Sequence, residues 1–217
     1  QVPNSNSPYG TECRACWTVP DDYKLVGIDA SGLELRMLAH YMDDKEFTNE
    51  ILHGDIHTAN QKFAGLESRS QAKTFIYAFI YGAGDEKLGT VVGGGRADGQ
   101  RLKQSFLDNL PSLRNLKNRV TRAAAKGHIK GLDGRKIYIR SAHAALNSLL
   151  QGGGSIVMKE ALCLLNSYIQ DNNLDAHFVA NIHDEWQIEV LEKDAKKVGE
   201  LGILAIQNAG LEFDMKC

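Results

Sequence analysis

Residues 176–190 read AHFVANIHDEWQIEV, and this stretch decides the fold class of the chain. Apolar residues fill both halves of the stretch, on either side of His183-Asp184-Glu185, which predicts two antiparallel strands joined by a tight polar turn. A second hairpin is predicted at 128–140, HIKGLDGRKIYIR, where Asp133-Gly134 is a strong turn signal. Hairpins set between helical segments, in place of alternating strand–helix–strand units, indicate an α+β fold.

The remaining elements are predicted from hydrophobic periodicity and from residues that start or stop helices. A short apolar strand at 23–29 leads into a helix at 33–42, where Ser31 and Glu34 are spaced as a capping box. Further helices are predicted at 55–63, at 69–81 behind Ser68, over the basic region of roughly 99–126, at 144–170 across three glycines, and at 193–209. The first twenty residues, rich in Pro, Ser and Asn, are predicted to be irregular.

The composition is that of an ordinary globular protein, with 43% hydrophobic and 24% charged residues in 217. No apolar run approaches the roughly 20 residues of a membrane span, so we expect no membrane association. The four cysteines, Cys13, Cys16, Cys163 and Cys217, are too scattered for a disulfide framework and favour a reducing, intracellular setting. Cys13-x-x-Cys16 has no second ligand pair at a zinc spacing, so incidental thiols are the favoured interpretation.

Positive charge is concentrated in one segment of a chain whose net charge is only −2. Between 113 and 143, Asp133 is the single acidic residue. The basic residues there are Arg114, Lys117, Arg119, Arg122, Lys126, Lys130, Arg135, Lys136 and Arg140. Such asymmetry predicts contact with a phosphate backbone, and a solvated helix face is the alternative.

The helix predicted at 69–81 carries a polar stripe, because Arg69, Lys73, Tyr77 and Tyr81 recur every four residues. Two cations near the N-terminus of a helix oppose its macrodipole unless an anion lies there. A polyphosphate would satisfy the dipole and both cations together. The alternative is an exposed cationic face with two tyrosines at the edge of the core.

Two aspartates stand where apolar strands end. Asp29 closes the strand at 23–29, and Asp184 lies between the strands of the 176–190 hairpin. Carboxylates from neighbouring strand ends suit a pair of Mg²⁺ ions that stabilise the attacking and leaving oxygens of an in-line displacement. For each aspartate taken alone, a turn or capping role remains the commoner alternative.

The order of these elements resembles motifs A, B and C of the family A DNA polymerases, the relatives of bacterial DNA polymerase I. The matching segments are DASGLELR at 29–36, Arg69-x3-Lys73-x3-Tyr77-x3-Tyr81-Gly82, and His183-Asp184-Glu185. GDIHTANQ at 54–61, AKTFIYAFIYGAGDEKLG at 72–89, IKGLDGRK at 129–136 and SAHAALNSLLQ at 141–151 are similar to the replicative polymerases of short-tailed coliphages. The resemblance covers nearly the whole chain.

The resemblance implies a role for each matching position. Asp29 and Asp184 would bind two Mg²⁺ ions, with the carbonyl of Ala30 as a further ligand. The incoming triphosphate would be held by Arg69, Lys73 and His57, and Lys73 could protonate the pyrophosphate leaving group. Tyr77 would pack against the sugar and base and, being Tyr, would allow ready acceptance of dideoxynucleotides. Glu34 and Tyr81 would exclude a ribose 2′-hydroxyl, although Glu34 also has its capping role as an alternative.

Further residues would contact the primer and template. The resemblance implies that His183 and Glu185 help place the primer end, that Asn147 and Gln151 touch the duplex, and that the basic segment with Arg135 and Arg140 follows the backbone. A structural metal at His53, Asp55 and His57 is disfavoured, because the resemblance makes His57 a phosphate contact.

The implied architecture is a polymerase palm with a small antiparallel sheet plus helical fingers. Residues 1–42 and 131–217 would form the palm, and 43–130 the fingers. The chain begins past the point where the family carries a further arginine, and it has no room for a thumb or an exonuclease domain. We therefore expect weak DNA binding and little activity from these 217 residues alone.

The implied partners are primer–template DNA, dNTPs and possible contact with a processivity factor through a thumb absent from this chain. The implied setting is the cytoplasm of a phage-infected bacterial cell. Two alternatives stay open. A single-subunit RNA polymerase shares the metal aspartates but lacks the acidic gate that Glu34 supplies, and an inactive nucleic-acid-binding fragment would lack catalysis altogether.

Overall fold

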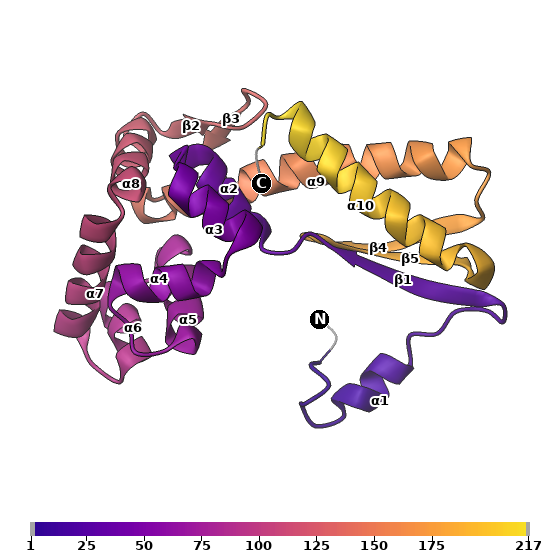
Figure 1. Ribbon diagram of the computed structural model, residues 1–217, viewed down its shortest axis with the longest axis horizontal. Helices are drawn as coiled ribbons and strands as arrows, with labels where there is room; N and C mark the ends of the chain where they lie inside the picture. The colour runs from indigo at the N-terminus through magenta and orange to yellow at the C-terminus, as the bar shows by residue number, and fades with distance from the viewer. Residues whose placement is uncertain (1–2, 216–217) are drawn as a thin grey trace. The chain divides into compact units, whose positions relative to one another are not determined.

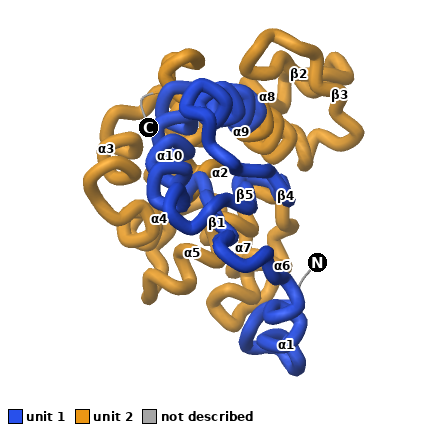
Figure 2. Tube along the Cα trace, turned by 90° about the vertical axis from the view of Figure 1, so that its right-hand side faces the viewer, with its two compact units in different colours: residues 1–31, 158–209 blue, residues 32–157, 210–217 orange. Residues whose placement is uncertain are grey.

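The structure, a computed structural model, describes residues 3–215, so Cys217 of the four cysteines lies outside the described residues. The chain divides into two compact units, which Figure 2 colours separately. We call residues 1–31 and 158–209 the sheet unit, and residues 32–157 and 210–217 the helical unit. The boundaries expected for palm and fingers stay a prediction.

The sheet unit is built on a three-stranded antiparallel sheet (Figure 1). Its strands are β1 (Tyr23–Asp29), β4 (Ala176–Ile182) and β5 (Glu185–Leu191), in the order β1-β5-β4. The central strand β5 alternates strictly, since Trp186, Ile188 and Val190 are fully buried and the residues between them are half-buried. The predicted hairpin at 176–190 and the strand at 23–29 are confirmed.

The register of the sheet separates an apolar face from a polar one. Ile28 pairs with Trp186 and Asp29 pairs with Glu185, and directly paired residues point to the same side of a sheet. The apolar side packs on α10 (Ala195–Glu212), where Gly202 leaves room for Ile28. An added Cβ at Gly202 would lie 2.4 Å from Ile28 Cδ1. The opposite side therefore presents Asp29 and Glu185 away from this packing.

The N-terminal part of the sheet unit contains a short helix, α1 (Gly10–Ala15), so the prediction of an irregular segment was wrong there. Its start depends on backbone contacts that leave no periodic signature. Tyr9 takes φ 60°, the amide of Gly10 donates to Ser7 O, and Arg14 Nε donates to Pro3 O at 3.0 Å.

The helical unit carries α2 to α8, two small strands and the first part of α9 (Ala145–Asp171). The helices are α2 (Leu33–Met42), α3 (Lys45–His53), α4 (Ile56–Ala64), α5 (Arg69–Ile80), α6 (Asp85–Gly89), α7 (Arg96–Asn109) and α8 (Pro111–Ala124). Strands β2 (His128–Lys130) and β3 (Lys136–Tyr138) form the second hairpin, and short 3-10 turns lie at Thr90–Val92 and Ala142–Ala144; a third, Glu192–Asp194, belongs to the sheet unit. The predicted helices at 33–42, 55–63, 69–81 and 144–170 are thus confirmed to within a few residues.

The structure refines three local expectations. The basic region is two helices, because Pro111 lacks an amide hydrogen and starts α8 at its N1 position. The N-cap of α2 is Gly32, in the left-handed region at φ 63°, one residue later than the Ser31 that the sequence indicated. The predicted hairpin at 128–140 is confirmed as β2 and β3, whose connection at 131–135 contains Asp133 and Gly134, the latter at φ 86°.

Helix α5 is anchored from one side. Ser68 and Gln71 form a capping box, each side chain accepting from the other's backbone N–H at 3.2 Å. Phe75, Ile76, Phe79 and Ile80 are buried, and the ring of Phe106 on α7 packs edge-on against Phe75. The opposite face of α5, with Arg69 and Lys73, is exposed. Among the described residues, no helix is both long and apolar enough to cross a membrane.

Substituting two helical glycines should change stability in opposite directions. In Gly99→Ala the new Cβ would lie 1.7 Å from the carbonyl oxygen of Asp85, so backbone must move, and we expect a loss of about 2 kcal/mol or more in the free energy of unfolding. Gly199→Ala in α10 meets nothing within 4 Å and should gain roughly 0.5–1 kcal/mol from helix propensity. Urea denaturation of both variants checks this, and equal effects would contradict the packing at α6–α7.

Candidate functional site

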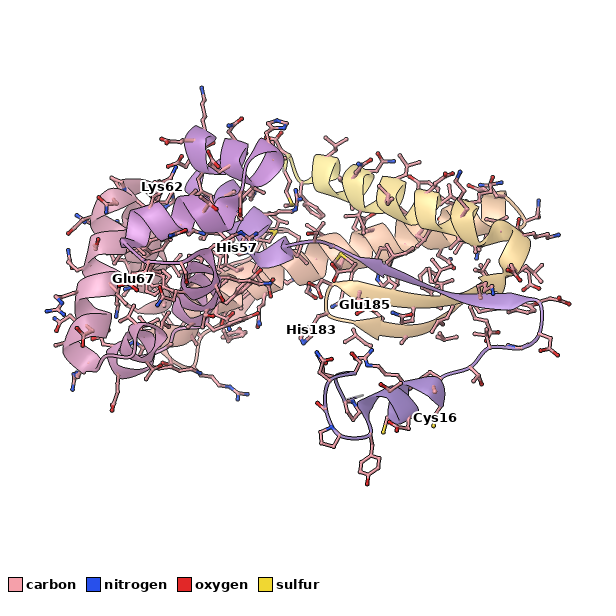
Figure 3. The ribbon with its side chains drawn as sticks, turned by 60° about the horizontal axis from the view of Figure 1, so that its bottom comes forward. Cys16, His57, Lys62, Glu67, His183 and Glu185 are labelled. Carbon is pink, nitrogen blue, oxygen red and sulfur yellow. The ribbon has the colours of Figure 1, made fainter. Side chains whose placement is uncertain are left out.

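Three acidic residues come together at one end of the sheet unit. Asp29 is the last residue of β1 and pairs in register with Glu185, the first residue of β5. Asp184 lies in the turn beside them, and its carbonyl accepts from the amide of Ala30 at 2.9 Å. Figure 3 labels His183 and Glu185 at this end of the hairpin. The structure therefore brings together the two aspartates that the sequence analysis singled out, together with Ala30, Glu185 and His183.

The turn that places Asp184 has an uncommon backbone. β4 and β5 are joined by His183 and Asp184 alone, and His183 takes φ 55°. A positive φ at the first of two turn residues normally favours Gly, and it disfavours other residues by about 1–2 kcal/mol. The tight turn keeps Asp184 within backbone hydrogen-bonding distance of the segment that follows β1.

Gln187 is a residue of this site that sequence reasoning missed. Its side-chain amide donates to the carboxylate of Glu185, two residues earlier on the same face of β5. Gly27 lies directly opposite on β1, where an added Cβ would be 2.9 Å from Gln187 Nε2. A glycine inside an apolar strand was the available signal, since it often marks a close approach.

The donor set of the sheet unit fits a hard divalent cation. Asp29, Asp184 and the carbonyl groups next to them offer oxygen ligands, which Mg²⁺ prefers over nitrogen or sulfur. In residues 3–215, no three His, Cys, Asp or Glu side chains lie close enough to enclose a metal by themselves. Mg²⁺ commonly takes only one or two protein carboxylates and completes its shell with water and substrate phosphates, so two aspartates are enough.

A second set of predicted residues lies in the helical unit, on α4 and α5. Arg69 and Lys73 are exposed on the first turns of α5, as the four-residue spacing predicts. The rings of His57 and Tyr77 lie 6.2 Å apart, and those of Tyr77 and Tyr81 are stacked at 6.4 Å. The stripe on α5 is thus continued onto α4 through His57.

Asp55 links α4 and α5 through hydrogen bonds to residues of both helices. Its carboxylate accepts from Arg69 Nε at 2.5 Å and caps α4 by accepting from the amides of His57 and Thr58. The hydrogen bond from Arg69 holds the pKa of Asp55 well below its usual range. These bonds give the carboxylate a role other than the metal cluster with His53 and His57 that was considered from the sequence.

Glu34 and Tyr81, for which the resemblance implies a role in sugar selection, are hydrogen-bonded to each other in the structure. The hydroxyl of Tyr81 donates to Glu34 Oε1 at 2.7 Å, which joins the start of α2 to the end of α5 inside the helical unit. Burial first, and then the bond to Glu34, raise the pKa of Tyr81 to about 12. The side chain of Gln151 also hydrogen-bonds Tyr81. Tyr81 is therefore a neutral donor at physiological pH.

His57 should be uncharged at neutral pH. Burial, and then the positive charge of Arg69, lower its pKa below the ordinary 6.5, while Asp55 opposes this shift. Because the unfolded chain then binds the proton first, stability should fall as pH drops below about 6.5. An NMR titration of the imidazole should give a midpoint below 6.5, moved back toward 6.5 in Arg69→Ala. A wild-type midpoint at or above 6.5 would contradict this environment.

The residues predicted to contact DNA differ from one another in exposure and in their hydrogen-bond partners. Arg140 and Gln151 are exposed, whereas Arg135 pairs with Asp133 through Nε at 2.6 Å. Among the described residues, the buried Oδ1 of Asn147 has no hydrogen-bond partner. Within the basic segment, Arg114 pairs with Asp108. The run of charge read from the sequence is therefore partly neutralised.

Comparison with known proteins gives consistent matches. The sequence profile described as DNA polymerase family A matches residues 1–216. The DNA-directed DNA polymerases of Enterobacteria phage T3 and Escherichia phage T7 are 40% and 39% identical to the chain across all of it. DNA polymerase I of Pseudomonas aeruginosa is 27% identical over 95% of the chain.

A solved structure is similar in fold. The POL domain of Pol1 from M. smegmatis, in complex with DNA primer-template and dNTP, matches with a TM-score of 0.85 at 23% identity. The match covers 96% of this chain and 41% of that one. The chain spans 36% of the length of the two phage polymerases. The α+β fold with small antiparallel sheets is thereby confirmed as that of a polymerase domain.

Proposed function

The chain belongs to DNA polymerase family A, and on that basis we propose that it carries the nucleotidyl-transfer centre of a template-directed DNA polymerase. One structural observation supports this proposal in addition to family membership. The end of β1 and the β4–β5 turn are joined by the bond from Ala30 N to Asp184 O, which sets two aspartates of the motifs at one sheet end. A two-ion phosphoryl-transfer mechanism requires such a pair of carboxylates.

Asp29 and Asp184 hold two Mg²⁺ ions in this proposal, and the carbonyl of Ala30 is a further ligand. When bound, such ions lower the pKa of the primer 3′-hydroxyl and neutralise charge on the α-phosphate. Glu185, oriented by the amide of Gln187, and His183 at the turn position the primer end.

The helical unit supplies the triphosphate contacts. Arg69 and Lys73 lie at the positive end of α5, where anionic oxygens are favoured by the helix dipole. His57, uncharged in the nucleotide-free protein, donates one further hydrogen bond to the phosphates from its ring N–H. Lys73 is the proton donor to the departing pyrophosphate, and Tyr77 packs against sugar and base.

The sugar is selected by Glu34 and Tyr81, whose hydrogen bond fixes both side chains in place. Primer–template DNA is contacted by Asn147, Gln151, Arg135 and Arg140. Since Arg135 is already paired with Asp133, we assign it a weaker share of the backbone contact than Arg140.

We propose primer–template DNA and dNTPs as the partners, and the cytoplasm of a phage-infected bacterium as the setting, from the 40% identity to a phage polymerase. Contact with a processivity factor stays a prediction.

Primer extension by the full-length natural protein tests the proposed function. The protein should add dNTPs to a primer as the template directs, in a reaction that requires Mg²⁺. Equal rates with dNTPs and rNTPs would favour a single-subunit RNA polymerase instead. Binding of the primer–template without extension would show an inactive nucleic-acid-binding protein.

A further inference from the structure

Asp55 receives more hydrogen bonds than a helix cap needs. Its Oδ1 accepts from the amides of His57 and Thr58 at 3.0 and 3.4 Å, which satisfies the first turn of α4. Its Oδ2 accepts from Thr58 Oγ1 at 2.9 Å and from Arg69 Nε at 2.5 Å. The bond to Arg69 contributes nothing to capping α4 and joins two helices of the unit.

Stability alone does not account for the pair. The side chains of Arg69 and Asp55 are 56% and 41% exposed, and exposed ion pairs contribute little because water and salt screen them. The geometry of the Arg69–Asp55 pair instead fixes the orientation of the guanidinium. A guanidinium held through Nε keeps a fixed plane, so its terminal N–H groups point in a defined direction and can grip a phosphate bidentately.

The same carboxylate also fixes the backbone of His57. The amide of His57 is bonded to Asp55, and the imidazole lies beside Tyr77 of α5. One side chain thus fixes two groups on different helices, both of which the proposed function assigns to the triphosphate.

We propose that Asp55 is a positioning residue for the incoming nucleotide, and this rests on the proposed function. It holds Arg69 and His57 in the arrangement that receives the triphosphate before the nucleotide arrives. Because the orientation is present in advance, binding does not have to order two flexible side chains. The carboxylate acts through Arg69 and His57 and does not touch the phosphates.

Asp55→Asn separates positioning from capping. Asn caps helices as well as Asp does, and its Oδ1 can still accept from the amides of His57 and Thr58. Its Nδ2, however, replaces the oxygen that accepts from Arg69 and opposes one N–H donor with another. The cap therefore remains while the hold on Arg69 is lost.

Asp44→Asn is a matched control. Asp44 caps α3 by accepting from the amide of Phe47 at 3.0 Å, and its other oxygen accepts from the hydroxyl of Ser112. A serine hydroxyl can donate or accept, so Asn preserves both contacts. This variant repeats the chemical change at a cap whose side-chain partners are a backbone amide and a serine hydroxyl.

The test measures single-nucleotide incorporation by the full-length protein on primer–template DNA over a range of dNTP concentrations. In Asp55→Asn we expect the half-saturating dNTP concentration to rise about tenfold, as for loss of a charged hydrogen bond, with the maximal rate changed less than about twofold. Asp44→Asn should match the wild type. Arg69→Ala should also raise the half-saturating concentration, and adding Asp55→Asn to it should change nothing more, because the positioned group is gone.

The outcomes separate the two proposals. If the wild type incorporates dNTPs and Asp55→Asn has the same half-saturating concentration, the positioning role is wrong while the proposed function stands. Full additivity of Asp55→Asn with Arg69→Ala, or tighter dNTP binding in Asp55→Asn, would overturn it equally. No incorporation by the wild type would instead reject the proposed function.

Discussion

Asp184→Ala is expected to lower nucleotide incorporation by roughly 10³-fold or more, because metal ions supply several kcal/mol of charge stabilisation and each 1.36 kcal/mol is tenfold in rate. Asp29→Ala should have an effect of the same order. Both aspartates lie at the same end of the sheet, where the amide of Ala30 donates a hydrogen bond to the carbonyl oxygen of Asp184. Single-turnover primer extension by the full-length protein at saturating Mg²⁺ and dNTP measures the loss.

Glu189→Gln is the matched control for this loss. Glu189 lies on β5, four residues from Glu185 and on the same face of the sheet, so it tests whether any negative charge there matters. We expect it to stay close to the wild type. Circular dichroism should show all three variants folded, and near-normal incorporation by Asp184→Ala would refute the assignment of the aspartates.

Glu34→Ala is expected to weaken the preference for dNTPs over rNTPs by roughly a hundredfold, the discrimination that exclusion of one hydroxyl can supply. Glu34 is held by the hydroxyl of Tyr81 at 2.7 Å, and its removal leaves space that a ribose 2′-hydroxyl can fill. The ratio of incorporation efficiencies for a matched dNTP and rNTP pair measures the change.

Glu34→Gln provides the control for that result. Gln has nearly the same volume and its carbonyl oxygen still accepts from Tyr81, so most of the discrimination should remain. An unchanged ratio in the Ala variant, with incorporation of dNTPs intact, would show that the gate lies elsewhere.

The elements that hold the carboxylates could be predicted because their signals are local. The alternation in 185–191 and the polar pair at 183–184 define the hairpin, and β1 ends at Asp29 as its apolar run does. The register that brings Asp29 opposite Glu185 could not be read from the sequence. It depends on the packing of Trp186 and Ile28 on the other face of the sheet.

Of the features that the sequence did not predict, one is a local backbone conformation and two depend on contacts between residues far apart in the sequence. The cap of α2 falls on Gly32 because its backbone is left-handed, although Ser31 and Glu34 have the right spacing for a box. The bond from Arg69 to Asp55 spans fourteen residues, and the cross-strand space that Gly27 leaves for Gln187 depends on register. Residue spacing along the sequence does not predict any of these three features.

The family resemblance assigned roles to individual residues more specifically than residue spacing did. For Asp29 and Asp184 as single residues, a turn or cap remained the commoner reading, and only the order of three motifs made a metal pair specific. The structure adds how the neighbours of those residues are held, through Asp55 for Arg69, Tyr81 for Glu34 and Gln187 for Glu185.

The most direct test of the central claim is to count Mn²⁺ ions in a complex of the full-length protein with dNTP and a dideoxy-terminated primer–template, where no reaction can occur. Electron paramagnetic resonance of the unbound Mn²⁺ gives the number bound. The wild type and Glu189→Gln should each bind two ions, as a two-ion mechanism requires, and Asp29→Ala and Asp184→Ala should bind fewer. Two ions bound with unchanged affinity in both alanine variants would contradict the claim that these carboxylates hold the metals.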